Sequence, residues 1–410
     1  MAGGPEGLSL MRIAMLVNNL DVSGGYQKLV LRLSFELKRK NHEVCIYTAS
    51  LNREACYPEM INDLTIKTPK KKHAAVGRFL KPLEKFAGPF REARKFRELA
   101  NIMDTNFDAW IIHDHYMLYT LSALNISRVS KVVWMLNNEM PEGFELPPSK
   151  NCHEMYADGL VRMLKNARWY LAKWMEWRAI TRGLGKVSSV AVYDEYNRRE
   201  VTRRLGIPAV NVHAGADVRE HVKTYHQRAS GVIRVVSVGV MFPHRRYEDL
   251  IEAVALARKR GLDVQAIIVG RRDLCPEYSR LITHLVRKRG CEEFVKFRDL
   301  VSDEELVELY GRADIFCFVN DGKTWGIAVF EAVAARIPVI ISNNIGAADL
   351  LVDGASAWVV HPRAPEEIVA AIEDIANHPK RALIATNRAA EVLPLVTWDS
   401  YTDRMLALFN

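Results

Sequence analysis

The sequence predicts an α/β protein made of two domains, each with a parallel sheet covered by helices on both faces. Short apolar runs alternate with longer stretches of helical spacing along the chain, which is the pattern of a doubly wound sheet. The alternation stops at a polar stretch near 216–230 and then starts again. The length of 410 residues suits two domains of about 150–200 residues each.

The first domain is expected over residues 11–215, after an N-terminal tail of residues 1–10. Leu29, Leu33 and Leu37 share one helical face, which predicts a helix over 26–40, and a second helical stretch covers about 153–182. The buried strands predicted for this domain are 12–17, 43–48, 108–113, 131–136 and 188–192.

The second domain is expected over 216–390, and a C-terminal helical segment over 391–410 is expected to pack back on the first domain. In doubly wound sheets, ligands bind beyond the carboxyl ends of the strands, so the default site is a cleft between the two domains. The predicted strands are 232–239, 264–270, 314–319 and 338–342, and the predicted helices are 249–259, 277–289, 303–311, 326–335, 365–377 and 398–409.

The composition is that of an ordinary globular protein, with 49% hydrophobic and 26% charged residues, which excludes disordered and fibrous classes. The net charge of +8 comes from one stretch. Residues 67–98 hold eleven Lys/Arg and three Glu, so the remainder of the chain is neutral. Phenylalanines interleave with these cations, which suits docking on an anionic membrane surface. A basic loop in solvent and an RNA-binding segment are the alternatives.

Other sequence features exclude several classes of protein. The six cysteines are scattered without a C-x-x-C pair, which argues against a zinc site and for free thiols in a reducing compartment. The N-terminus lacks the basic start and apolar stretch of a signal peptide, and no run of about 18 apolar residues could span a membrane. We therefore expect a cytoplasmic protein, at most peripheral on the inner face of the membrane.

Loops that follow the predicted strands carry the candidate site residues. Gly24 and Gly25 precede the first helix, whose free N–H groups suit a phosphate, and a plain turn is the alternative. His115 follows strand 108–113 and could bind a sugar hydroxyl, and a structural histidine is the alternative. Arg245 and Arg246 follow strand 232–239, where adjacent guanidinium groups can clamp a diphosphate. A solvated basic turn is the alternative there.

The most specific stretch is 321–332, a loop that runs into a helix at Gly326. The helix carries a single acid, Glu331, among apolar neighbours. A carboxylate in such a position needs a partner, and ligand hydroxyls would serve, whereas an acid that faces water or a nearby cation is the alternative.

In order and spacing, these stretches resemble the retaining, GT-B-fold glycosyltransferases of glycosyltransferase family 4. The resemblance covers the chain from Arg12 to the C-terminal helix. It is carried by SGGYQ, SVGVMFPHRRYEDLIEAV, VSDEELVELYGRADIFCFV and TWGIAVFEAVAARIPVI. It implies two Rossmann-like domains with a cleft between them, the acceptor on the first and a nucleotide-sugar on the second. By this resemblance Gly24 and Gly25 approach the donor phosphates, Gln27 lies near the acceptor, and His115 contacts the transferred sugar.

The second domain both matches and departs from the family pattern. Arg245 matches the cation that holds the diphosphate, and Glu331 matches the acid that hydrogen-bonds the nucleotide ribose. Lys323 stands where the family has a first acid, and Val240 replaces its usual arginine. We hypothesise that Lys323 takes over part of the phosphate clamp or meets a donor sugar bearing a carboxylate; a solvent-exposed loop lysine is the alternative. The other residues expected at the donor are Arg246, Trp325 and Gly326.

The resemblance implies a retaining glycosyltransferase that moves a sugar from a nucleotide-sugar to a carbohydrate or lipid-linked acceptor, such as a surface-polysaccharide precursor. No D-x-D motif occurs in the chain, so neither a metal nor a further cofactor is expected beside the nucleotide-sugar co-substrate, and no nucleic-acid partner is expected. The alternatives are a sugar-nucleotide epimerase of similar fold and a basic RNA-binding protein.

Overall fold

The chain divides into two compact units. Unit 1 takes the N-terminal part up to Val192 together with Asn197–Val212 and Thr402–Asn410, whereas unit 2 takes Tyr193–Tyr196 and His213–Tyr401. The sequence predicts a domain boundary after residue 215, and in the structure the chain passes from unit 1 to unit 2 after Val212. The computed structural model describes residues 10–69, 94–137, 174, 177–218 and 231–410. Most of the basic stretch 67–98, most of the helical stretch 153–182 and much of the polar stretch 216–230 lie outside the described residues.

Unit 1 is built on a seven-stranded sheet in the order β3-β2-β1-β4-β5-β6-β7, and every pair of neighbours is parallel. The central strands are buried along nearly their whole length, as expected of a parallel sheet with both faces covered. The strands are β1 (Arg12–Val17), β2 (Glu43–Thr48), β3 (Ile66–Lys67), β4 (Ala109–His113), β5 (Lys131–Met135), β6 (Ser189–Val192) and β7 (Ala209–Asn211). The helices that lie wholly within the described residues are α1 (Gly25–Arg39), α2 (Pro58–Ile61), α4 (Met117–Ala123) and α6 (Glu195–Leu205).

The core of unit 1 follows from the apolar pattern. Leu29, Leu33 and Leu37 are buried on one face of α1, as their spacing predicts. Trp110 on β4 and Trp134 on β5 are fully buried. These side chains hold the sheet and its helices together, and they leave the loops at the strand ends to carry polar groups.

A lysine fixes the end of helix α4. Nζ of Lys186 donates to the carbonyl oxygens of Leu121 (3.0 Å), Ser122 (3.3 Å) and Leu124 (2.5 Å). The Leu121 carbonyl also accepts the N–H of Leu124, and the cation adds a second donor there while it complements the negative end of the helix dipole. The helix that follows β4 is therefore anchored at its far end.

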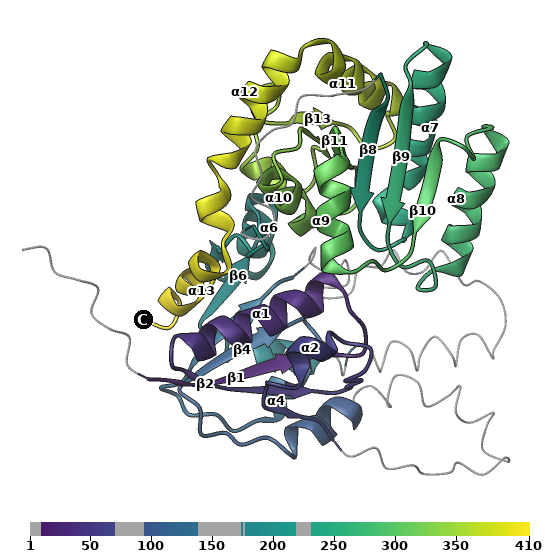
Figure 1. Ribbon diagram of the computed structural model, residues 1–410. Coiled ribbons are helices and arrows are strands. Elements are labelled where there is room, and N and C mark those ends of the chain that lie inside the picture. The colour runs from purple at the N-terminus through teal and green to yellow at the C-terminus, as the bar shows by residue number, and fades with distance from the viewer. Residues whose placement is uncertain (1–9, 70–93, 138–173, 175–176, 219–230) are drawn as a thin grey trace, which may run out of the picture. The chain divides into compact units, whose positions relative to one another are not determined.

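Unit 2 contains a six-stranded parallel sheet in the order β10-β9-β8-β11-β12-β13 (Figure 1). The strands are β8 (Ile233–Val238), β9 (Val264–Val269), β10 (Val295–Arg298), β11 (Ile315–Phe318), β12 (Val339–Ser342) and β13 (Trp358–Val360). The α-helices are α7 (Tyr247–Lys259), α8 (Pro276–Lys288), α9 (Asp303–Arg312), α10 (Ile327–Ala334), α11 (Pro365–Asn377) and α12 (Pro379–Ala390). Helix α13 (Trp398–Ala407) begins in unit 2, and its residues from Thr402 onward belong to unit 1. Three 3-10 turns complete the unit, at η4 (Pro243–Arg245), η5 (Gly346–Asp349) and η6 (Leu393–Val396).

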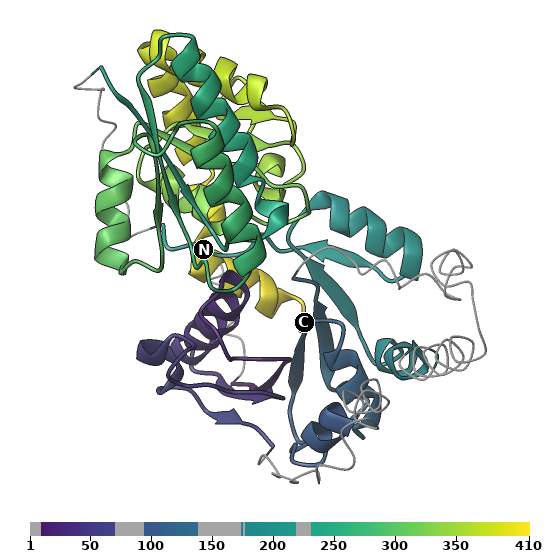
Figure 2. The same cartoon turned by 90° about the vertical axis from the view of Figure 1, so that its right-hand side faces the viewer.

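Helices cover both faces of this sheet (Figure 1, Figure 2). Helix α7 packs against α8, α11 and β9, whereas α9 packs against β8, and α10 packs against β11 and β12. Ser302 begins α9 by accepting the backbone N–H of Glu305 at 3.2 Å, which is an N-cap. Proline occupies the first turn of α8, α11 and α12, where its missing N–H costs nothing. The sequence prediction of two doubly wound α/β domains is confirmed.

In the described part of the chain, no helix is both long and apolar enough to cross a membrane.

Candidate active site

Each sheet has one place where ligands are expected. In unit 1 the chain adds β2 and β3 on one side of β1 and then adds β4 and the later strands on the other side. In unit 2 it adds β9 and β10 on one side of β8, and β11 to β13 on the other. Ligands of doubly wound sheets bind at the carboxyl ends of the two strands where the order reverses. These switch points lie between β1 and β4 and between β8 and β11.

The loop after β1 brings Gly24, Gly25 and Gln27 together. Gly24 has an extended backbone and directly precedes α1, and Gly25 is the first residue of that helix. A Cβ atom on Gly24 would lie 2.9 Å from Oε1 of Gln27, so the loop packs against a glycine here. Gln27 is buried, and its Nε2 donates to Oδ1 of Asn19 at 2.9 Å.

A neighbouring segment holds this loop in place. Oγ of Ser23 donates to the carbonyl of Ala55 and accepts the N–H of Tyr57, both at 3.1 Å. The hydroxyl of Tyr57 donates to the carbonyl of Gly24 at 3.3 Å. The glycine pair is thus clamped from the 55–57 segment, a contact that the local sequence pattern does not reveal.

The end of β4 carries two histidines in different environments. His113 is fully buried, and burial lowers its pKa to about 4, so its ring is neutral at neutral pH. Its Nδ1 lies 3.5 Å from Oδ1 of Asn137, the residue two positions beyond β5. His115 has a partly exposed side chain, and its Nδ1 lies 3.2 Å from Oδ1 of Asp114. Of the two rings, His115 is therefore the one with surface to offer a ligand, and its role at the transferred sugar stays a prediction.

Arg245 is the most unusual cation at the switch point of unit 2. Its guanidinium carbon lies 4.4 Å from the centre of the Phe318 ring, at the end of β11. Nε and Nη1 are buried and have no hydrogen-bond partner among the described residues. Burial lowers the pKa of Arg245, because nothing compensates the desolvation of its charge fully. A buried cation in this state favours an anionic ligand.

Gly239 and Tyr247 form part of the surroundings of the Arg245 guanidinium. A Cβ atom on Gly239 would lie 3.2 Å from Nε and Cζ of Arg245, so the backbone here passes directly beside the guanidinium group. The Tyr247 hydroxyl donates to the carbonyl of Gly239 at 2.9 Å, and burial raises the pKa of Tyr247 to about 12.

Arg246 does not form the paired clamp that the sequence suggests. Its guanidinium is engaged by two acids, with Nη2 2.6 Å from Oδ1 of Asp249 and Nη1 2.6 Å from Oε1 of Glu248. Its backbone is left-handed (φ +46°). Arg246 therefore stabilises the loop through its two ion pairs, and of these two arginines Arg245 is the one whose Nε and Nη1 have no partner among the described residues. The role of Arg246 at the donor stays a prediction without support from its contacts.

Lys323 lies on the loop after β11, which is tied to the loop after β8. The N–H of Asp321 donates to the carbonyl of His244 at 2.7 Å, next to Arg245. Nζ of Lys323 lies 4.3 Å from the centre of the Tyr196 ring, a cation–π contact. Lys323 and Arg245 therefore come from adjacent loops at one switch point.

Trp325 and Gly326 each have a structural role in this loop. The Trp325 side chain is 3% exposed, donates from Nε1 to the carbonyl of Ala214 at 3.2 Å and stacks on His213. Its ring is thus enclosed by protein, and its contact with the donor stays a prediction. Gly326 caps α10 with a left-handed backbone (φ +89°), a conformation that favours glycine.

Glu331 is buried on α10 and has a protein partner. The hydroxyl of Tyr310 donates to its Oε2 at 3.3 Å, and burial raises the pKa of Tyr310 well above its usual value. The requirement that an acid in an apolar helix has a partner is met by this hydroxyl. Tyr310 is a residue that sequence reasoning missed, since it lies on α9, far from Glu331 in the chain.

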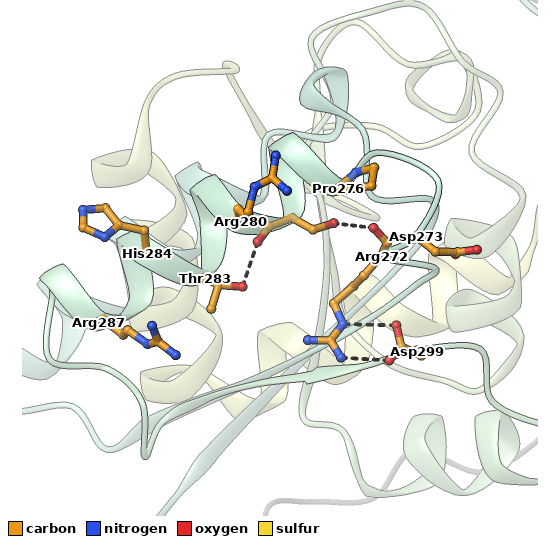
Figure 3. Close-up of a pocket in the computed structure, with 9 residues that line it drawn as sticks. Arg272, Asp273, Pro276, Arg280, Thr283, His284, Arg287 and Asp299 are labelled. Carbon is orange, nitrogen blue, oxygen red and sulfur yellow. Dashed lines mark hydrogen bonds and ion pairs between the residues drawn. The ribbon is translucent and has the colours of Figure 1, made fainter.

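A separate pocket of about 700 Å³ lies along α8 (Figure 3). Arg280, His284 and Arg287 extend from one side of the helix, and a pair between Arg272 and Asp299 (2.9 Å) crosses the end of the pocket. None of the residues predicted at the site lines this pocket. Its cations are exposed to solvent, so we assign it no part in the candidate site.

Among the residues that the structure describes, no group of three or more His, Cys, Asp or Glu side chains is arranged so that it could hold a metal ion.

Comparison with known sequences gives matches to two family models that together cover almost the whole chain. The model of Glycosyltransferase Family 4 matches residues 23–240, more than half of the chain. The model of Glycosyl transferases group 1 matches residues 219–392.

Two curated relatives illustrate the similarity. The alpha-D-kanosaminyltransferase of Streptomyces kanamyceticus is 26% identical over 53% of this chain and 58% of its own length. The GDP-mannose-dependent alpha-(1-6)-phosphatidylinositol monomannoside mannosyltransferase of Mycolicibacterium smegmatis is 29% identical over 36% of this chain and 40% of its own. The chain therefore spans about half the length of the curated relatives that it matches.

Solved structures agree in fold. A glycosyltransferase from Rickettsia africae has a TM-score of 0.69 at 15% identity and covers 98% of each chain. HepE from Anabaena, solved with UDP and glucose, has a TM-score of 0.68 at 14% identity and covers 97% of this chain and 98% of its own. The two-domain α/β architecture is thus the GT-B fold, and the chain belongs to glycosyltransferase family 4.

Proposed function

We propose that this protein is a glycosyltransferase that moves a sugar from a nucleotide-sugar to an acceptor. The observation that carries the proposal is Arg245, a buried cation at the switch point of unit 2 whose Nε and Nη1 have no partner within the described ranges. The diphosphate of a nucleotide-sugar supplies the oxygen acceptors and the negative charge that this guanidinium lacks. Family membership favours transfer over the alternative of a sugar-nucleotide epimerase, and it gives no support to RNA binding.

The reaction breaks the bond between the anomeric carbon and a diphosphate oxygen, and forms a bond from that carbon to the acceptor hydroxyl oxygen. The leaving diphosphate gains negative charge, which Arg245, Lys323 and the N-terminus of α10 would stabilise. His115 would contact the transferred sugar, Glu331 the ribose, and Gln27 the acceptor side. We propose that the configuration is retained, that no metal is needed, and that the donor phosphate takes the acceptor proton.

We propose a carbohydrate or lipid-linked acceptor. The name of the M. smegmatis relative describes a phosphatidylinositol-based acceptor, and WaaG, a solved neighbour, is described as involved in lipopolysaccharide biosynthesis. The basic stretch 67–98 would draw the protein to an anionic membrane surface, since each cation there contributes about 1 kcal/mol. A cytoplasmic protein that docks on the inner face of the membrane fits this acceptor.

A thermal-shift series tests the donor side. We expect UDP, GDP or ADP, or the corresponding nucleotide-sugars, to raise the melting temperature without added metal, because a ligand at about 100 times its Kd stabilises the folded state by about 2.7 kcal/mol. The matching nucleotide-sugar and a carbohydrate acceptor should then give product whose anomeric configuration is read by NMR. A protein that binds none of these nucleotides, or that epimerises a nucleotide-sugar without acceptor, would refute the proposal.

Lys323 gives a second test at the same loop. If its ammonium faces the diphosphate, Lys323→Glu should slow transfer about tenfold, the effect of a like-charge contact of about 1.4 kcal/mol. Lys323→Ala should reduce the rate of transfer less than Lys323→Glu does. If the ammonium instead meets a carboxylate on the donor sugar, Lys323→Ala should lose activity mainly with uronate donors. Rates and donor choice that stay unchanged in both variants across a panel of nucleotide-sugars would remove Lys323 from the site.

A further inference from the structure

Asp114, the residue before His115, lies beside one nitrogen of the His115 ring. Oδ1 of Asp114 lies 3.2 Å from Nδ1 of His115, and the same oxygen accepts the backbone N–H of Tyr116 at 2.8 Å. The backbone of Asp114 is left-handed (φ +76°), a conformation that Asp and Asn tolerate better than other non-glycine residues. All these contacts arise within three consecutive residues at the end of β4.

The Asp114 carboxylate lies in a mostly buried place, with 23% of its side chain exposed. Burial raises the pKa of Asp114, and the largest opposing influence is the charge of His115, followed by the N–H of Tyr116 and the side chain of Asn18. On α1, burial raises the pKa of Tyr26, and the charge of Asp114 raises it further. Burial thus disfavours the ionised carboxylate, and His115 is the strongest of the groups that offset this effect.

The His115 ring is also fixed on its flat side. It packs on the ring of Tyr116 with centroids 4.0 Å apart, and Tyr116 stacks on Phe96 at 5.9 Å. These aromatic contacts limit rotation of the ring, and the contact with Asp114 places the Nδ1 edge of the ring at the carboxylate. His113 differs, because its Nδ1 neighbour is the neutral amide of Asn137.

We propose that Asp114 is a positioning residue that keeps the proton of neutral His115 on Nδ1 and so directs Nε2 to the ligand. In a neutral imidazole, the partner of one nitrogen decides which nitrogen carries the proton. With Nδ1–H beside the carboxylate, the lone pair lies on Nε2, which can accept a hydrogen bond from a sugar hydroxyl. This second step rests on the proposed function, whereas the choice of tautomer does not.

Nitrogen-15 NMR of histidine-labelled protein tests the tautomer directly. The two-bond proton–nitrogen correlation distinguishes a protonated from an unprotonated ring nitrogen, and His115→Gln identifies the His115 signals among the twelve histidines. At a pH where the ring is neutral, we expect the proton of His115 on Nδ1 in the natural protein. A proton found mainly on Nε2 would overturn the proposal.

Two variants separate positioning from a role in the turn. Asp114→Asn keeps an oxygen for the Tyr116 N–H and tolerates the left-handed backbone, but it removes the charge. We expect Asp114→Asn to lower the titration midpoint of His115 and to populate both tautomers of its ring. Asp114→Ala should have the same two effects more strongly. An Asp114→Asn protein with the tautomer and midpoint of the natural protein would show that Asp114 only shapes the turn.

Kinetics with a nucleotide-sugar donor complete the test. Asp114→Asn should lower kcat about tenfold, as loss of the partner that orients a functional histidine typically does, with little change in the donor KM. Asp63→Asn, an exposed aspartate in the same unit, is the matched control and should leave kcat unchanged. If the NMR result holds but no nucleotide-sugar is turned over by the natural protein, the proposed function fails and the positioning of His115 stands.

Discussion

Replacing Arg245 by alanine is expected to remove nucleotide binding without weakening the fold. The guanidinium of Arg245 is desolvated, and its Nε and Nη1 have no partner in the described part of the chain, so its burial stabilises the ligand-free protein little. In the transition state the same group would face the charge that develops on the leaving diphosphate. Loss of one preorganised donor of this kind costs about 100-fold or more in kcat.

Two measurements check the Arg245→Ala result. The melting temperature without ligand should not fall, whereas the rise caused by a nucleoside diphosphate should disappear. Arg280→Ala, an exposed arginine on α8, is the control and should keep both the rise and the activity. An Arg245→Ala protein that still binds and transfers like its parent would place the diphosphate elsewhere.

Gly270→Ala is expected to cause the largest loss of stability. Gly270 directly follows β9, and a Cβ atom there would lie 1.9 Å from the carbonyl oxygen of Gly239, which follows the neighbouring strand β8. Both groups belong to backbone, so neither can rotate away. We expect the free energy of unfolding to fall by about 3 kcal/mol or more, as for other overpacking and strain in a core.

Denaturant unfolding of unit 2 measures this effect. Gly231→Ala is the matched control, because its Cβ would meet nothing within 4 Å, and it should change the free energy of unfolding by less than about 0.5 kcal/mol. A folded Gly270→Ala protein should also bind nucleotide more weakly, since Gly239 borders Arg245. Equal stability of the two alanine variants would contradict the close approach of the two strand ends.

The central strands could be predicted from sequence because their apolar character is continuous. Strands β1 and β2 have the predicted bounds to the residue. Edge strands were missed: β3 has two residues, and β10 reads VKFR with alternating exposure. A strand at a sheet edge pairs on one side and is less buried, so its local pattern carries little signal. The polar helix α6 was missed because only Asn197 and Val201 are buried in it, which leaves no apolar periodicity to detect.

The site loops could be located from sequence, but the partners of their side chains could not. Strand ends are predictable, and a parallel sheet gathers them at one edge. Which cation remains unpaired depends on three-dimensional contacts: Asp249 and Glu248 engage Arg246, whereas Arg245 lies against Phe318. In the same way, the burial of Trp325 follows from residues about a hundred positions earlier in the chain. Contacts between residues so far apart in the chain cannot be predicted from a local sequence pattern.

The buried carboxylate of Asp249 has a consequence for how the site in unit 2 opens. It accepts the Arg246 guanidinium and the N–H of Arg363, while the guanidinium of Arg363 pairs with Asp321 at 2.5 Å. Loops that follow β8, β11 and β13 are thereby joined through two acids, Asp249 and Asp321, that share Arg363. Thermal opening of one loop breaks the contacts of the other two, so their amide protons should exchange with solvent as a single cooperative group, and a ligand that orders one loop would slow exchange in all three.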